Sequence, residues 1–137
     1  MALNIRQLDQ ASLAAINQNL EPRKDKDIKQ FTEQLENAAK QLSAKLPEVQ
    51  ESSKNEAERL GHAINALVSY FGPLVDNAIG CSSNMVNSKQ QVLLLDQTKT
   101  VAECAQQLLY ASKESGGNPK VNILFFKSHL LGFKSSY

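Results

Sequence analysis

The most constraining feature of the sequence is a row of apolar residues that recur every three or four positions along residues 28–49. A second row with the same spacing follows along residues 60–78. This period puts apolar side chains on one side of an α-helix, so each row predicts an amphipathic helix packed against others. The two rows consist of Ile28, Phe31, Leu35, Ala38, Leu42, Leu46 and Val49, then Leu60, Ile64, Leu67, Phe71, Leu74 and Ala78.

Two further patterns predict helices over residues 3–20 and 89–115. The first ends at Pro22, because a proline pushes the residue before it out of the α region. The second ends at Gly116-Gly117, a pair suited to the left-handed cap of a helix. Their predicted inward residues are Ile5, Leu8, Ala15 (or Ser12), Ile16 and Leu20, then Leu94 (or Leu95), Val101, Ala105 and Leu108.

Prolines fall inside both of the strong rows. Pro47 predicts a kink or an end of its helix near Lys45. Gly72-Pro73 predicts a kink only, because the apolar row keeps its phase beyond it. Asp25 or Asp27 is expected to cap the helix that follows. Four helices of roughly 17 to 28 residues, joined by short polar loops, predict an all-α, up-down bundle of four amphipathic helices.

Residues 121–137, VNILFFKSHLLGFKSSY, differ in character from the four patterns. Their apolar residues nearly adjoin, and they fit neither the helical period nor the alternation of a strand. We therefore expect the chain to have two parts. Residues 1–120 form an incomplete helical bundle, and residues 121–137 form a divergent apolar C-terminal tail.

Charge and composition restrict the partners of the chain. Fifteen basic and fourteen acidic residues give the 137 residues a net charge of +1. Nucleic acids and anionic membranes attract clustered positive charge, so this balance argues against both partners. No apolar run approaches the roughly 18 residues of a membrane span, and Cys81 and Cys104 read as reduced thiols. We expect a cytoplasmic protein without direct membrane insertion.

Residue types that support catalysis form no constellation in this sequence. His62 and His129 have no partner at metal-ligand spacing, and no phosphate-binding or nucleophile motif occurs. Glu103 and Glu114 lie on one helix about 16 Å apart, too far for acid–base work on one bond. We therefore predict no catalytic residue, no metal site and no cofactor. The remaining class of function is a non-enzymatic protein that recognises a partner through its surface.

Glu114 has two interpretations from the residues alone. It lies in the last turn of its predicted helix, where a negative charge meets the negative end of the helix dipole, at a cost of about 0.3 kcal/mol. Glu114 is either one of many surface glutamates or a carboxylate presented to a basic partner.

Three stretches of the chain resemble helices of the ninth bundle of the talin rod. LDQASLAA at 8–15 resembles its first helix, and LGH at 60–62 with YF at 70–71 and PL at 73–74 resembles its third. Three further stretches resemble its fourth helix: LLDQTKT at 94–100, LLY at 108–110 and GGNPK at 116–120. The resemblance covers residues 5–120 in register and is most specific in the fourth helix.

The resemblance implies a segment of a cytoskeletal adaptor that links integrin to actin at focal adhesions. In the family, this bundle docks on the phosphotyrosine-binding-like lobe of the talin head and so inhibits integrin activation. Glu114 stands where the family has a glutamate that pairs with a lysine of the head. Ala111 stands where vertebrate members have a threonine in the same contact. Integrin and actin are implied as indirect partners.

The chain departs from the family at both ends. The family bundle has five helices, the first of which begins before the position of Met1. A polar fifth helix is expected after Lys120, where this chain has the apolar tail, so the head-facing surface is expected to be incomplete. Two alternatives therefore stay open: a helix donor for vinculin, and a truncated translation product without autonomous function.

Overall fold

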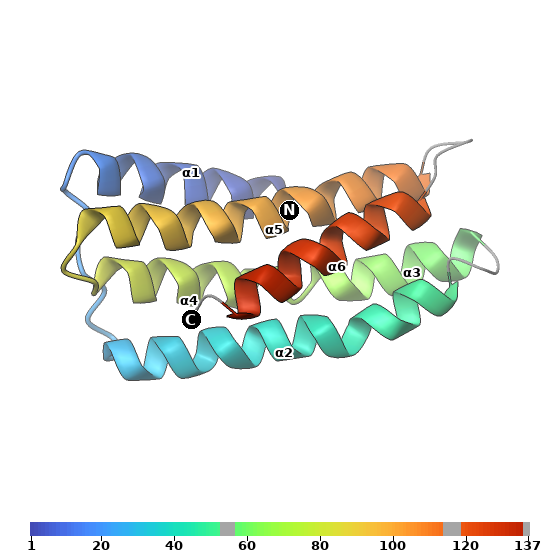
Figure 1. The fold of residues 1–137 in the computed structure, drawn as a ribbon, viewed down its shortest axis with the longest axis horizontal. Coiled ribbons are helices and arrows are strands. Elements are labelled where there is room, and N and C mark those ends of the chain that lie inside the picture. The colour runs from blue at the N-terminus through green and yellow to red at the C-terminus, as the bar shows by residue number, and fades with distance from the viewer. Residues whose placement is uncertain (53–56, 114–118, 136–137) are drawn as a thin grey trace.

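The computed structural model describes residues 1–52, 57–113 and 119–135, which contain six α-helices (Figure 1). No strand occurs within these three stretches. The predicted all-α bundle is therefore confirmed, with six helical segments in place of four. The helices are α1 (Ala2–Ile16), α2 (Ile28–Ser52), α3 (Ala57–Val68), α4 (Phe71–Ser83), α5 (Ser88–Lys113) and α6 (Pro119–Ser135).

Helix α2 stays helical past Pro47 and ends at Ser52. The end near Lys45, one of the two alternatives predicted for Pro47, is therefore wrong, and the kink stays a prediction. Proline removes one backbone hydrogen bond, but Leu46 and Val49 on either side of it are 6% and 0% exposed. The burial of these two side chains in the core outweighs the lost hydrogen bond.

The start of α2 carries a capping box. The Oδ1 atom of Asp27 accepts a hydrogen bond from the N–H of Gln30 at 2.7 Å, and the side chain of Gln30 accepts one from the N–H of Asp27 at 3.0 Å. This reciprocal pair satisfies two backbone donors that a helix start leaves free. Asp27 is thus the cap, as one of the two predictions had it. Ile28, the first member of the predicted row, is 43% exposed beside it.

Helix α1 ends earlier than predicted, at Ile16, which is itself 62% exposed and not inward. Gln18 follows with a φ of 58°, in the left-handed region. The N–H of Gln18 bonds the carbonyl of Ala15 at 3.1 Å, and that of Asn19 bonds the carbonyl of Ala14 at 2.9 Å. This pair of bonds is a Schellman motif, which closes the helix before the proline is reached.

The second strong row is divided between α3 and α4. The break falls at Ser69 and Tyr70, one turn before Pro73, and not as a kink at the proline. Proline cannot donate to the carbonyl four residues earlier and clashes with it, which displaces the break to Ser69. Leu67 and Phe71 on either side are both fully buried. The apolar row therefore keeps its phase across the break, as predicted.

Residues 121–135 belong to a regular helix, so the prediction that they fit no helical period is wrong. Their buried members are spaced by three and four residues, and α6 packs on α5 and α2. A second set of apolar residues on the opposite side hid this row from pattern reading. The division of sequence character at residue 120 stays a prediction. The buried members are Ile123, Phe126, Leu130 and Phe133.

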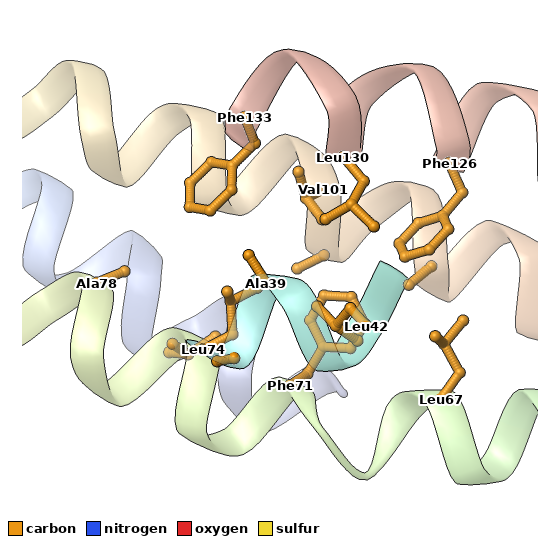
Figure 2. Packing of buried hydrophobic residues seen from close by; sticks show 14 of the residues in the cluster. Ala39, Leu42, Leu67, Phe71, Leu74, Ala78, Val101, Phe126, Leu130 and Phe133 are labelled. Carbon is orange, nitrogen blue, oxygen red and sulfur yellow. The ribbon is translucent and has the colours of Figure 1, made fainter. Parts of the chain in front are cut away.

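Helix α6 completes the core at its end of the bundle. Phe126, Leu130 and Phe133 point from α6 toward side chains of α2 and α4 (Figure 2). The rings of Phe126 and Phe71 are 6.1 Å apart between centroids and inclined by 55°. That geometry is favourable for an aromatic pair. The tail therefore forms a packed helix, where the sequence predicted a bundle that lacks its last helix.

Candidate functional site

Of the two residues predicted to contact a partner, Ala111 lies near the C-terminal end of α5. Ala111 is half-buried in its last turns. Glu114 lies outside the described residues. The α5 residues predicted to face inward are buried, with Leu94, Leu95, Val101, Ala105 and Leu108 between 0% and 6% exposed. Because these residues are buried, only the opposite side of α5 is open to a partner.

The opposite side of α5 carries a row of exposed residues that ends beside Ala111. We call this row the outer stripe. Its members follow at intervals of four and three residues, the spacing of one helix face. All of them are exposed. The outer stripe consists of Asp96, Thr100, Glu103, Gln107 and Tyr110.

The outer stripe is bordered by α1 and α6, which both pack on α5 (Figure 1). On the α6 side, the side-chain amide of Asn122 donates a hydrogen bond to the carbonyl of Gln107 at 3.1 Å. On the α1 side, Lys99 Nζ lies 2.6 Å from Asp9 Oδ1. These two contacts fix both neighbours of the stripe.

Electrostatics along the stripe are dominated by carboxylates. The hydrogen bond to Asp9 raises the pKa of Lys99. The charges of Asp9, Glu103 and Asp96 raise it as well, and desolvation opposes them. Since Lys99 is already paired with Asp9, the exposed carboxylates of Asp96 and Glu103 present negative charge to solvent. A basic partner surface is the complement of such a stripe.

The structure defines the surroundings of Cys104 and His62. Burial, and next the charge of Glu103, raise the pKa of the Cys104 thiol, so this cysteine is protonated at neutral pH and a poor nucleophile. His62 lies 3.9 Å from Glu58, with both side chains largely exposed. Among the residues that the structure describes, no group of three His, Cys, Asp or Glu side chains is placed to hold a metal ion.

A hollow of about 370 Å³ between α2, α4 and α5 is lined mainly by apolar side chains, Ile28, Leu35, Met85 and Leu93 among them. Cys81 also lines it, with its sulfur 3.4 Å from the hydroxyl of Thr32. This lining offers no acid–base pair. In the described part of the chain, no helix has the length and apolar character needed to cross a bilayer.

Sequence reasoning placed the predicted contact at single residues and missed the outer stripe that leads to them. The signal was present, because the polar residues at 96, 100, 103 and 107 have the same spacing as the inward row. Polar residues at this spacing are common on solvated helix faces, so the pattern alone does not distinguish a binding surface.

The fold defines a class: an all-α bundle of amphipathic helices, here with an exposed acidic stripe on α5. A family model described as Talin 1-like, rod segment domain, matches residues 1–125. The chain is 45% identical to Talin-2 of Mus musculus over 116 residues, or 85% of the chain. It is 45% identical over 116 residues to Talin-1 of Gallus gallus, and 44% identical over 119 residues to Talin of Oscarella pearsei.

The chain therefore belongs to the talin rod segment family. It spans about 5% of the length of these relatives. The family match ends at residue 125, inside α6, so most of that helix lies beyond it.

Proposed function

We propose that the chain is a segment of a non-enzymatic cytoskeletal adaptor, equivalent to the ninth bundle of the talin rod. In this role it docks on the phosphotyrosine-binding-like lobe of the talin head and restrains integrin activation. The cytoplasm, at focal adhesions, is its proposed location, with integrin and actin as indirect partners. The observation that carries the proposal is the outer stripe of α5.

The stripe supports docking through its charge and its direction. Asp96 and Glu103 line it, and it runs toward Ala111. Its spacing of three and four residues continues in the sequence to Glu114. In the proposal, Glu114 pairs with a lysine of the head, and the carboxylates of the stripe steer that basic surface into place. Ala111 contributes a small, half-buried contact without a hydroxyl group.

Helix α6 affects this proposal because it borders the stripe. In the family, a polar fifth helix contributes to the head-facing surface. In this chain, Asn122 of α6 is bonded to Gln107 of the stripe. The proposed docking surface thus consists of α5 with a neighbour of different character, and we expect weaker binding than with a polar fifth helix.

The test is titration of the intact chain into isotopically labelled head lobe, followed by NMR chemical shifts. We expect Glu114→Lys to weaken binding by about 1–3 kcal/mol, because it replaces a paired charge by a like charge. Glu103→Lys should weaken it less, by slowing association. Glu33→Lys, an exposed glutamate on α2, is the matched control and should change nothing.

Two results would overturn the proposal. The first is a folded chain that shifts no signal on the basic face of the head lobe. The second is tight binding to vinculin head that does not depend on Glu114, which favours the helix-donor alternative. The remaining alternative, a truncated product without autonomous function, predicts broad, uncooperative thermal unfolding of the whole chain.

A further inference from the structure

Helix α6 exposes a second apolar side opposite the one that packs in the core. We call it the outer face of α6. The members of this face fall on the side of the helix turned away from Phe126 and Leu130. Amphipathic helices in water normally have a polar outer side, so this face is unusual. Its members are Val121, Leu124, Phe125 and Leu131, which are 45%, 64%, 58% and 55% exposed.

Positive charge flanks the outer face of α6. Lys120 and Lys127 are exposed and lie seven residues apart, which places them on one side of the helix. The sequence continues this spacing with a lysine at 134, and residues 119–135 contain no aspartate or glutamate. The near-neutral balance of the whole chain concealed this local cluster, because its acidic residues lie in other segments.

Helix α1 shows that exposed apolar residues alone do not make such a surface. Leu3, Leu13 and Ile16 of α1 are about as exposed as the outer face of α6. They alternate around that side with Arg6 and Asp9, which carry opposite charges. The outer face of α6 combines four apolar side chains, with Ser128 among them, and flanking charge of one sign.

We propose that the outer face of α6 docks on an anionic lipid surface. Leucine, phenylalanine and valine side chains enter the boundary between headgroups and acyl chains, while flanking lysines contact anionic headgroups. Helix α6 lies on the outside of the bundle, between α5 and α2 (Figure 1). The flanking lysines, with no acidic residue in 119–135, give this face a charge complementary to anionic headgroups. The helix lies on the surface without crossing it, since its inner side stays in the core.

The test is cosedimentation of the intact chain with vesicles of phosphatidylcholine alone and with vesicles that also contain anionic phosphatidylserine. We expect binding to the anionic vesicles, weakened by added salt. Changing Lys120 and Lys127 together to Gln should weaken binding about fivefold per lysine. Changing Leu124 and Phe125 together to Ser should weaken it by at least about tenfold, because apolar burial is lost.

A matched control is Leu13→Ser on α1, which removes a leucine of 61% exposure from a side with mixed charge. It should leave vesicle binding unchanged. Circular dichroism must show each variant folded. Absence of binding, equal binding to neutral vesicles, or binding unaffected by the Leu124 and Phe125 changes would overturn the proposal. A second copy of the chain on this face would also overturn it. In that case the parent chain would sediment as a dimer and bind no vesicles, and the Leu124 and Phe125 variant would sediment as a monomer.

Discussion

Helices α1 and α6 both pack on α5, α1 along its N-terminal half and α6 along its C-terminal half (Figure 1). Helix α1 also contacts α4, whereas α6 also contacts α2. The two helices occupy comparable places in the bundle but bury residues of different size. The buried residues of α1 are Leu8, Ala11 and Ala15, and those of α6 are Ile123, Phe126, Leu130 and Phe133.

This difference teaches that α5 accepts two kinds of neighbour. Small residues allow α1 to approach closely, and its outer side reaches α5 through the Asp9–Lys99 ion pair. Large residues let α6 reach into the core and meet Phe71. Core packing constrains only the inner side of each helix, so the outer side is free to take up another role.

The largest effect should come from removing the aromatic anchor of α6. Phe126→Ala is expected to lower the free energy of unfolding by about 3–5 kcal/mol, because it leaves a cavity beside Phe71. Phe125→Ala, the neighbouring residue at 58% exposure, should change it by less than about 0.5 kcal/mol. Denaturant unfolding of both variants measures the difference. Equal effects would show that α6 is not anchored through its inner side.

A second substitution probes the end of the bundle that α1 occupies. Gly80 of α4 lies under the ring of Phe31, and an added Cβ would come within 3.0 Å of three ring atoms. Gly80→Ala should therefore cost about 1–3 kcal/mol through overpacking.

Gly61→Ala in α3 is the matched control, since nothing lies within 4 Å of its added Cβ. It should stabilise the protein by about 0.5–1 kcal/mol through helix propensity. Thermal melts of the two variants should therefore shift in opposite directions. Shifts of the same sign would contradict the close contact at Gly80.

The end of α1 offers a smaller gain. Gln18 occupies the left-handed region that glycine adopts without steric cost. Gln18→Gly should raise the free energy of unfolding by up to about 1 kcal/mol, reduced by the greater freedom of glycine in the unfolded chain. Denaturant unfolding measures it, with Asn17→Gly as the control that should destabilise, because Asn17 has a φ of -82°.

The smallest effect concerns the ion pair that joins α1 to α5. Lys99→Met should cost about 0.2–1 kcal/mol at low salt and less at high salt, since the pair is partly exposed. The pKa of Lys99 is raised above 10.5, mainly by its hydrogen bond to Asp9. Its stabilisation is therefore complete below pH 10.5 and is lost as pH rises through the folded-state pKa. Unfolding measured between pH 8 and 11, about the range of this titration, should show a decline in the parent that is absent in Lys99→Met.

Particular elements show how far sequence reasoning reaches. The burial of the row from Phe31 to Val49 was predictable, because one period persists over about five turns of α2. The burial of the inner side of α5 was predicted from its spacing in the same way. Helix α6 was missed because apolar residues on two opposite sides erase the contrast on which periodicity depends. The site was predicted as Glu114 and Ala111, whereas the outer stripe depends on which neighbours cover α5.

The sequence by itself determined an all-α bundle, the inner sides of α2 to α5 and the talin rod segment family, because repeated spacing and residue identity are local properties. Only the tertiary structure decided where α1 closes, that Pro47 is tolerated, and that α6 enters the core beside Phe71. Each of these outcomes depends on contacts between residues distant in the chain. Burial against such partners outweighs local preferences, and it also decides which sides of the helices remain open to others.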